Sequence, residues 1–179
     1  GHIGPTRSPR APRWLRRCVV VGLAVVCMQI ALGGWTSTNY AALACPDLPT
    51  CQGQWWPEAD FATGFTPWHG LGIDYEGGVL DGPARTAIHV SHRLGAVVTA
   101  VVLSALALAC AWPGRCRVLR GAGGAIAGVL ALQIGLGIAT VAWLLPLPVA
   151  TAHNGGAALL LLTLVATLRL ITPDERYDR

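Results

Sequence analysis

Charged residues are scarce in this chain of 179 residues, and lysine is absent from it. Charged side chains make up 12% of the sequence and hydrophobic ones 53%, which excludes an ordinary soluble globule and favours a membrane protein. All thirteen basic residues are arginine, so fixed cations carry the net charge of +4. The arginines form no stripe with interleaved aromatic residues, and no nucleic-acid motif is present, so we expect no nucleic-acid partner.

Aspartate and glutamate are missing from four long apolar stretches, which predict four membrane-spanning helices. The predicted spans cover residues 18–35, 86–112, 121–145 and 149–168, and each is about long enough to cross ~30 Å of hydrocarbon. The absence of carboxylates from the spans argues against a di-metal carboxylate centre. The predicted fold class is therefore an all-α integral membrane protein, an antiparallel four-helix transmembrane bundle surrounded by membrane lipid.

The segments between the spans predict how the chain lies in the membrane. Residues 18–172 form the membrane domain, 1–17 a flexible Arg/Pro-rich tail, 36–83 a long loop with six acidic residues, and 173–179 a second tail. Eleven arginines flank the spans on one side, and only Arg85 and Arg93 lie on the other. The positive-inside rule then places both tails in the cytoplasm and the loop outside, in a multi-pass protein of the cell inner membrane.

The first span has an alternative interpretation as a signal peptide. It follows a run of arginines, and Ala42-Leu43-Ala44 before Cys45 resembles a cleavage site. The apolar run is long for a signal, and the site lies well beyond its end, so we favour a retained span. The chain begins with Gly1 and not with methionine, which we expect of a fragment or a processed form.

A short internal repeat predicts that the bundle consists of two pseudo-symmetric helical hairpins. Gln29-Ile30-Ala31-Leu32-Gly33 recurs as Gln133-Ile134-Gly135-Leu136-Gly137. His92-Arg93-Leu94-Gly95-Ala96 recurs as His153-Asn154-Gly155-Gly156-Ala157. Two such hairpins packed about a pseudo-two-fold axis would bring the two histidines to opposite sides of one central cavity.

His92 and His153 are the candidate axial ligands of a heme iron. Each lies about four residues, or ~6 Å, inside its span, on helices predicted to be antiparallel neighbours. An intramembrane histidine marks a functional site by default, and two imidazoles at one depth suit a heme. The alternative is an interhelical hydrogen bond from each histidine. His89, three residues before His92, is a rival ligand or a donor to a heme propionate.

The surroundings of the two histidines extend this prediction. Gly95 and Gly156, one turn further along, are predicted to leave room for a flat porphyrin. Arg85 and Arg93 at the outer rim are expected to pair with the propionates. The remaining small and amide residues are assigned only to helix packing and interhelical hydrogen bonds: Gln29, Gln133, Gly33, Gly34, Gly121, Gly124, Gly128, Gly135 and Gly137.

The loop contains Cys45 and Cys51, for which a disulfide is favoured on the oxidising side of the membrane. A structural bridge and a redox-active one are both open. A zinc site would need two more ligands, with only His69 nearby, and no Cys-x-x-Cys-His motif indicates covalent heme attachment. Five aromatic residues are expected to seat the loop on the membrane interface or to dock a partner, and four other cysteines to serve packing: Trp55, Trp56, Phe61, Phe65 and Trp68, then Cys18, Cys27, Cys110 and Cys116.

Three motifs together resemble the heme A synthase family. They are Leu32-Gly33-Gly34-Trp35, then Cys45-Pro46-Asp47-Leu48-Pro49-Thr50-Cys51-Gln52-Gly53, and Ile88-His89-Val90-Ser91-His92-Arg93, with Thr151-Ala152-His153 as a later match. Members of that family are membrane enzymes of two similar four-helix halves. They oxidise a methyl group of heme O to the formyl group of heme A for terminal oxidases, and so serve cytochrome oxidase assembly.

The resemblance also implies which half this chain is. One half of such an enzyme holds the substrate heme, with a glutamate three residues before its His-Arg pair, and here that position is His89. We therefore expect the C-terminal half, which binds heme b through His92 and His153. Its partners would be the substrate-binding half and an unknown electron partner, and its catalytic residues are unknown. The alternative is a non-catalytic bis-histidine cytochrome that relays electrons or carries heme.

Overall fold

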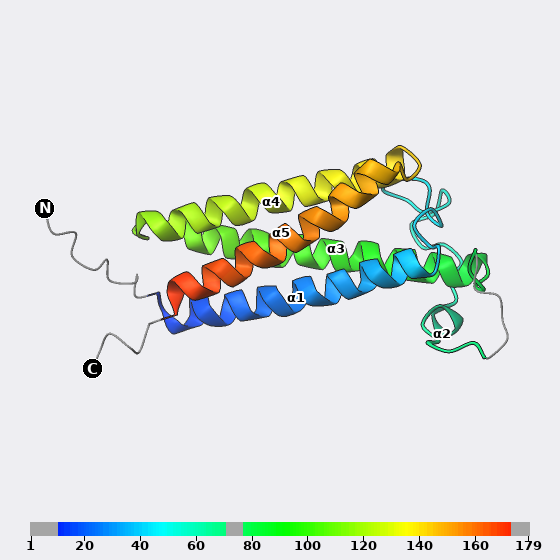
Figure 1. Cartoon of the computed structure of the whole chain (residues 1–179), viewed down its shortest axis with the longest axis horizontal. Helices are drawn as coiled ribbons and strands as arrows, with labels where there is room; N and C mark the ends of the chain where they lie inside the picture. Colours follow the sequence, from blue (N-terminus) through cyan, green and yellow to red (C-terminus); the bar gives the residue numbers. More distant parts are fainter. Residues whose placement is uncertain (1–10, 71–76, 173–179) are drawn as a thin grey trace, which may run out of the picture.

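The structure, a computed structural model, describes residues 11–70 and 77–172. The predicted tail residues 1–10 and 173–179 lie outside the described residues. The described residues form four long helices and one short one, and no strand (Figure 1): α1 (Arg13–Thr38), α2 (Phe61–Gly64), α3 (Gly82–Ala111), α4 (Arg117–Ala142) and α5 (Leu147–Ile171). The four long helices are long and apolar enough to cross a membrane, which confirms the predicted all-α, multi-pass membrane fold.

The long helices form an antiparallel bundle in which α1 and α4 each pack against both α3 and α5. The helices α3 and α5 therefore face one another on a diagonal. Because every second helix of an up-and-down bundle runs in the same direction, these two run in parallel (Figure 1). This corrects the prediction that the histidine-bearing helices are antiparallel neighbours. The start of α1, the end of α5 and the α3–α4 connection lie at one end of the bundle.

Helix α1 begins earlier than the predicted span. It starts at Arg13, so Arg13, Arg16 and Arg17, which were expected in a flexible tail, are helical. A helix satisfies its own backbone hydrogen bonds beyond the hydrocarbon as well as within it, and long arginine side chains can extend to the polar interface. The apolar run therefore predicts which part of the helix lies within the hydrocarbon, but not where the helix begins or ends.

The connection between α4 and α5 also differs from the prediction. A third span to Leu145 and a turn at Pro146-Leu147-Pro148 were expected. Helix α4 instead ends at Ala142, and Leu144 and Leu145 turn the chain with φ of 55° and 64°. Pro148 lies in the first turn of α5. Proline is well tolerated there because the first helical N–H groups have no partner within the helix.

The apolar core fills the half of the bundle nearest the start of α1. Its buried side chains come from all four long helices: Leu15, Val19, Val26, Leu103, Leu106, Ala107, Cys110, Leu119, Ile126, Leu130, Leu160, Leu164 and Ile171. Of the four cysteines assigned to packing, only Cys110 is buried, and Cys18, Cys27 and Cys116 are exposed. Large apolar side chains also cover the outer faces of the helices, as expected for contact with lipid.

Glycine marks one close approach in this core, at a position that the sequence did not single out. A Cβ atom on Gly123 would lie 2.7 Å from the backbone oxygen of Ala107, so α4 meets α3 here. A Cβ on five of the glycines assigned to helix packing would meet no atom of the described structure within 4 Å, which corrects that assignment: Gly34, Gly121, Gly124, Gly128 and Gly135.

Candidate functional site

His92, half-buried on α3, is held by two residues of α1. The side-chain Nε2 of Gln29 donates to the backbone oxygen of His92 at 2.9 Å and lies 3.1 Å from its ring Nδ1. One turn further along α1, a Cβ on Gly33 would lie 3.2 Å from His92 Cε1. Since Gln29 and Gly33 are four residues apart, they share one face of α1, and the imidazole lies against both.

His153, half-buried on α5, is held in the same way by α4. Gln133 Nε2 lies 3.5 Å from His153 Nε2, and a Cβ on Gly137 would lie 3.1 Å from His153 Cε1. The structure thus places the two predicted ligands on α3 and α5, the helices that face each other across the bundle.

Gly95 and Gly156 each make room for a side chain of the neighbouring helix. A Cβ on Gly95 would lie 2.2 Å from Gln29 Oε1, and a Cβ on Gly156 would lie 2.3 Å from Gln133 Oε1. Each glycine therefore admits a glutamine side chain where space for a porphyrin was expected.

Gln29, Gln133, Gly33 and Gly137 are the site residues that the sequence interpretation assigned only to packing. A signal for them was present, since the pattern Gln-x-x-x-Gly is the repeated part of α1 and α4. The interhelical hydrogen bonds expected of the glutamines are found, and their partners are the two histidines.

His89, on α3, contacts the loop. It is 4% exposed, and its Nδ1 lies 2.9 Å from the backbone oxygen of Ala41 and 3.4 Å from the backbone nitrogen of Cys45. A carbonyl oxygen can only accept, so the shorter contact places the proton on Nδ1. Nδ1 is thus engaged by the loop, and the role of His89 as a rival ligand or a donor to a propionate stays a prediction.

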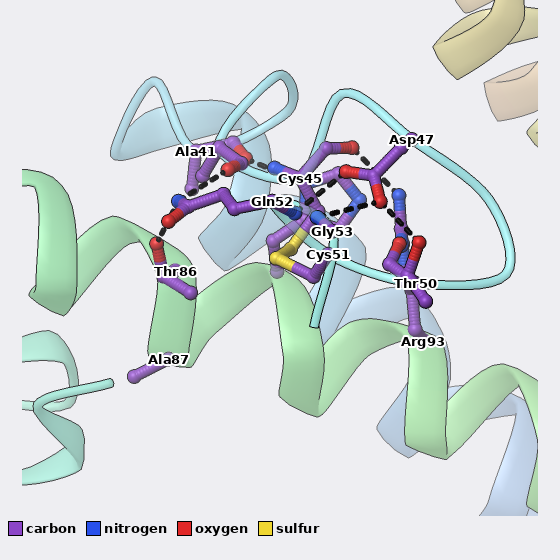
Figure 2. The surroundings of a disulfide bond; sticks show 12 residues. Ala41, Cys45, Asp47, Thr50, Cys51, Gln52, Gly53, Thr86, Ala87 and Arg93 are labelled. Atoms are coloured by element: carbon purple, nitrogen blue, oxygen red, sulfur yellow. Dashed lines mark hydrogen bonds between the residues drawn. A yellow bond between two sulfur atoms is a disulfide. The ribbon is translucent and has the colours of Figure 1, made fainter. Parts of the chain in front are cut away.

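Arg93 holds the disulfide loop against α3 (Figure 2). Its Nη1 donates to the backbone oxygen of Thr50 at 2.7 Å, and its Nη2 to that of Cys45 at 2.6 Å. Arg85 donates through Nε to the backbone oxygen of Leu80 at 2.8 Å. Arg93 was expected to pair with a propionate, and both of its terminal nitrogens instead bind loop carbonyls. Its position directly after His92 turns it by about 100° toward the loop.

The loop itself is closed by the expected disulfide between Cys45 and Cys51. The Asp47 carboxylate accepts from the Thr50 hydroxyl and from the backbone nitrogens of Gln52 at 2.6 Å and Gly53 at 3.1 Å (Figure 2). These hydrogen bonds, that of Thr50 first, lower the pKa of Asp47 below its ordinary value of 3.8.

Gln52 connects the loop closed by the Cys45–Cys51 disulfide to α3. Its side-chain Nε2 donates to the backbone oxygen of Ala44 at 3.0 Å and to Thr86 Oγ1 at 3.1 Å. A cavity of about 250 Å³ lies beside it, between the loop and the start of α3, and is lined by Tyr40, Leu43, Ala44, Gln52, Gly82, Arg85 and Thr86. The loop is thus hydrogen-bonded to α3 both before His92, at Thr86, and directly after it, at Arg93.

The exposed aromatic side chains lie further along the loop. Trp55 is 79% exposed, Trp56 66% and Trp68 64%. Trp35 donates through Nε1 to the backbone oxygen of Gly64 at 2.9 Å, which fixes α2 to α1. Contact of these tryptophans with the membrane interface or a partner stays a prediction.

The ligand set of the site is small. No three His, Cys, Asp or Glu side chains gather as a metal site anywhere in residues 11–70 and 77–172. Two facing imidazoles therefore suit a metal group that brings most of its own donor atoms. His153 Nδ1 is buried and has no hydrogen-bond partner, as a nitrogen available for coordination would be.

Comparison with known proteins shows a match to the family described as cytochrome oxidase assembly protein over residues 2–165. The chain is 49% identical over 146 residues to the heme A synthase of Shewanella oneidensis, covering 82% of the chain and 43% of that protein. It is 34% identical over 171 residues to the heme A synthase of Rhodospirillum centenum, covering 96% of the chain and 42% of that protein. The chain thus spans about two fifths of the length of these relatives. No solved structure matches it.

Proposed function

The chain belongs to the cytochrome oxidase assembly protein family, and from that premise we propose that it is the heme b-binding half of a heme A synthase. The observation that carries the proposal is the pair His92 and His153, each set against a glutamine and a glycine of the adjacent helix. Two such histidines on facing helices of a membrane bundle have the chemistry of axial heme ligands.

The residues of the site fit this group. The porphyrin supplies four nitrogens, and His92 and His153 would complete the coordination of the iron. The 3.5 Å contact between Gln133 and His153 is at the limit of a hydrogen bond, so little is lost when the ring turns to a ligand. When bound, a heme held by His92 and His153 would supply one-electron transfer.

The protein groups around the site hold and shield it. Gln29 and Gln133 orient the rings, the apolar helices exclude water, and the disulfide loop covers the outer end of α3. Oxidation of a methyl to a formyl group is a net loss of electrons. In this proposal the chain carries electrons to or from heme O held by the substrate-binding half, with a further, unknown electron partner.

His89 favours the cofactor-binding half. The substrate half of the resembled family has a glutamate at the corresponding position, whereas His89 is buried against the Ala41 carbonyl. The spans also contain no Asp or Glu that could serve as an acid or base. This observation keeps the alternative, a bis-histidine cytochrome without catalytic activity, as the second candidate.

The ligand assignment is tested by loading the purified full chain with ferric heme b. We expect a low-spin, six-coordinate spectrum that is lost in His92→Ala and in His153→Ala. His69→Ala, a change in the loop, is the matched control and should keep the spectrum. A low-spin spectrum that persists in both ligand variants would overturn the proposal, and loss in His153→Ala alone would point back to His89.

A second experiment separates the half-enzyme from the cytochrome. Cells that make heme O are given this chain alone, or this chain with a substrate-binding half from a relative. The half-enzyme hypothesis predicts heme A only when both are present. Heme A formed by this chain alone would refute it, and no heme A in either case, with heme b bound, would favour the cytochrome.

We propose the orientation from the arginines. Those described at the end of the bundle where α1 begins are Arg13, Arg16, Arg17, Arg115, Arg117, Arg120 and Arg169, and no described acidic residue lies on the helices there. The described acidic residues of the α1–α3 connection lie at the other end. The positive-inside rule then places both ends of the chain in the cytoplasm, in the inner membrane of a bacterial cell.

A further inference from the structure

We propose that Gln29 and Gln133 are positioning residues that set the rotation of the two imidazoles, and with it the angle between the ligand planes of the bound heme. The proposal rests on the proposed function, since it concerns how His92 and His153 present themselves to the iron.

Gln29 makes contacts that fix both the backbone and the ring of His92. One donates to the backbone oxygen at 2.9 Å, and the other places the amide nitrogen 3.1 Å from Nδ1. A side chain held at the main chain and touching one edge of the ring leaves the imidazole little freedom to turn about its Cβ–Cγ bond. Gly33, on the same face of α1, lies against the adjacent ring atom, since a Cβ there would lie 3.2 Å from Cε1.

A similar arrangement of a glutamine and two glycines around the histidine occurs in the second hairpin. There Gln133 contacts the ring of His153, Gly137 lies against its Cε1, and Gly156 makes space for the Gln133 amide. Helix packing alone would require small residues, but not an amide facing each histidine.

Glutamine is an expensive side chain in an apolar bundle, so its presence needs a reason. Gln29 Oε1 and Gln133 Oε1 are both buried and without a hydrogen-bond partner in the described structure. Leucine would fill nearly the same volume without this unsatisfied oxygen. A ring bound to a metal through one nitrogen usually donates its other N–H to an acceptor, and an amide can serve such a ring as donor or acceptor.

The two copies differ in how firmly they hold the ring. Gln29 has two contacts and faces Nδ1, whereas Gln133 has one contact of 3.5 Å and faces Nε2. We therefore expect the loss of Gln29 to disturb the ligand geometry more than the loss of Gln133.

The experiment uses the full chain loaded with ferric heme b, with Gln29→Leu and Gln133→Leu compared against Met28→Leu. Met28 is the matched control because it precedes Gln29 on α1 and is 65% exposed. The spread of the g values in the electron paramagnetic resonance spectrum of a low-spin ferric heme depends on the angle between its imidazole planes. We expect both glutamine variants to retain heme with an altered spread and a shifted midpoint potential, more so for Gln29→Leu, and Met28→Leu to match the wild type.

Substituting the glycines offers a second way to displace each glutamine amide from its histidine. In Gly95→Ala the new Cβ would lie 2.2 Å from Gln29 Oε1, so the amide must move away. Gly95→Ala should therefore reproduce the spectrum of Gln29→Leu, and the double variant should differ little from either single one. For the second hairpin, Gly156→Ala should act like Gln133→Leu, while Gly155→Ala, with open space around it, should change nothing.

The outcomes separate this inference from the proposed function. If His92→Ala and His153→Ala keep the low-spin spectrum, the proposed function fails. If those variants lose it but Gln29→Leu and Gly95→Ala keep the wild-type g values and potential, only the positioning role fails. Should Gln29→Leu not fold, Gln29→Glu replaces it. A carboxylate that accepts a hydrogen bond from the ring makes the imidazole a stronger electron donor to the iron, which should lower the midpoint potential of the heme. An unshifted potential would overturn the inference.

Discussion

At the scale of single residues, three neighbouring polar side chains of α3 serve different partners. His89 binds the carbonyl of Ala41, His92 meets Gln29, and Arg93 binds the disulfide loop. In the sequence they form one cluster that predicts one heme site. A step of about 100° per residue turns them to different neighbours, and a sequence does not state which neighbour lies in each direction.

Removing the Arg93 guanidinium should loosen the disulfide loop. Each hydrogen bond from a charged group contributes roughly 1.5–3 kcal/mol, so losing both carbonyl contacts should make local opening at least about a hundredfold more frequent. We expect a water-soluble phosphine to reduce the Cys45–Cys51 bond correspondingly faster in Arg93→Gln, as followed by thiol labelling.

Arg85→Gln is the control for Arg93→Gln, because Arg85 donates to the backbone oxygen of Leu80 and not to that of Cys45. Its reduction rate should stay near that of the wild type. Equal rates in all three proteins would show that the Arg93 contacts do not hold the loop.

Asp47 predicts how the loop responds to acid. Its pKa in the folded loop lies below the ordinary 3.8, so its hydrogen bonds stabilise the loop above that pH and are lost as the pH falls through the lowered value. Protection of the Gln52 and Gly53 amides from hydrogen exchange, corrected for intrinsic rates, should therefore decrease below pH 3.8. Asp47→Asn should show lower protection at neutral pH without this acid step, and Asp60→Asn should leave these two amides unchanged.

At the scale of elements, the four spans could be predicted because their lengths and lack of carboxylates are dictated by the membrane. The ends of the helices could not be predicted in the same way. Helix α1 extends to Arg13 through side chains that can reach the polar interface, and the turn at Leu144 and Leu145 contains no glycine that would indicate it in the sequence. Glycine positions were equally ambiguous. Gly123 and Gly124 are adjacent in sequence, and only the rotation of α4 decides that Gly123 meets α3.

Gly123→Ala should weaken the packing of α4 on α3. The added Cβ would lie 2.7 Å from the Ala107 oxygen, an overpacking that typically lowers the free energy of unfolding by about 1–3 kcal/mol. Gly124→Ala meets nothing within 4 Å and should raise it by up to about 1 kcal/mol through helix propensity. Thermal unfolding of both variants in detergent measures the difference, and equal midpoints would contradict the assigned contact.

At the scale of the whole molecule, the internal repeat was the most informative feature of the sequence. It predicted the pairing of His92 and His153, since matched positions in two hairpins fall at matched places in a pseudo-symmetric bundle. It did not predict Gln29 and Gln133 as their partners, because an amide in a membrane helix is equally well explained by helix–helix association. Contacts between α1 and α3 supplied that information.

The proposed orientation is tested with reporter insertions in the full chain. Alkaline phosphatase, which folds only outside the cytoplasm, should be active when inserted after Leu144 and inactive when inserted after Gly114. Green fluorescent protein at the same two positions should give the opposite pattern. Phosphatase activity at Gly114 would reverse the assignment of the membrane sides.

The two sides of the site, α3 and α5, are held by different contacts. On α3 the main chain at His92 is bonded to α1, and the next residue, Arg93, is bonded to a covalently closed ring. On α5 the residue after His153 is Asn154, which is exposed, and the connection to α4 is short. The α3 side of the site is thus hydrogen-bonded both to α1 and to the disulfide loop. We expect α5 to move more than α3 when the site changes width around an occupant.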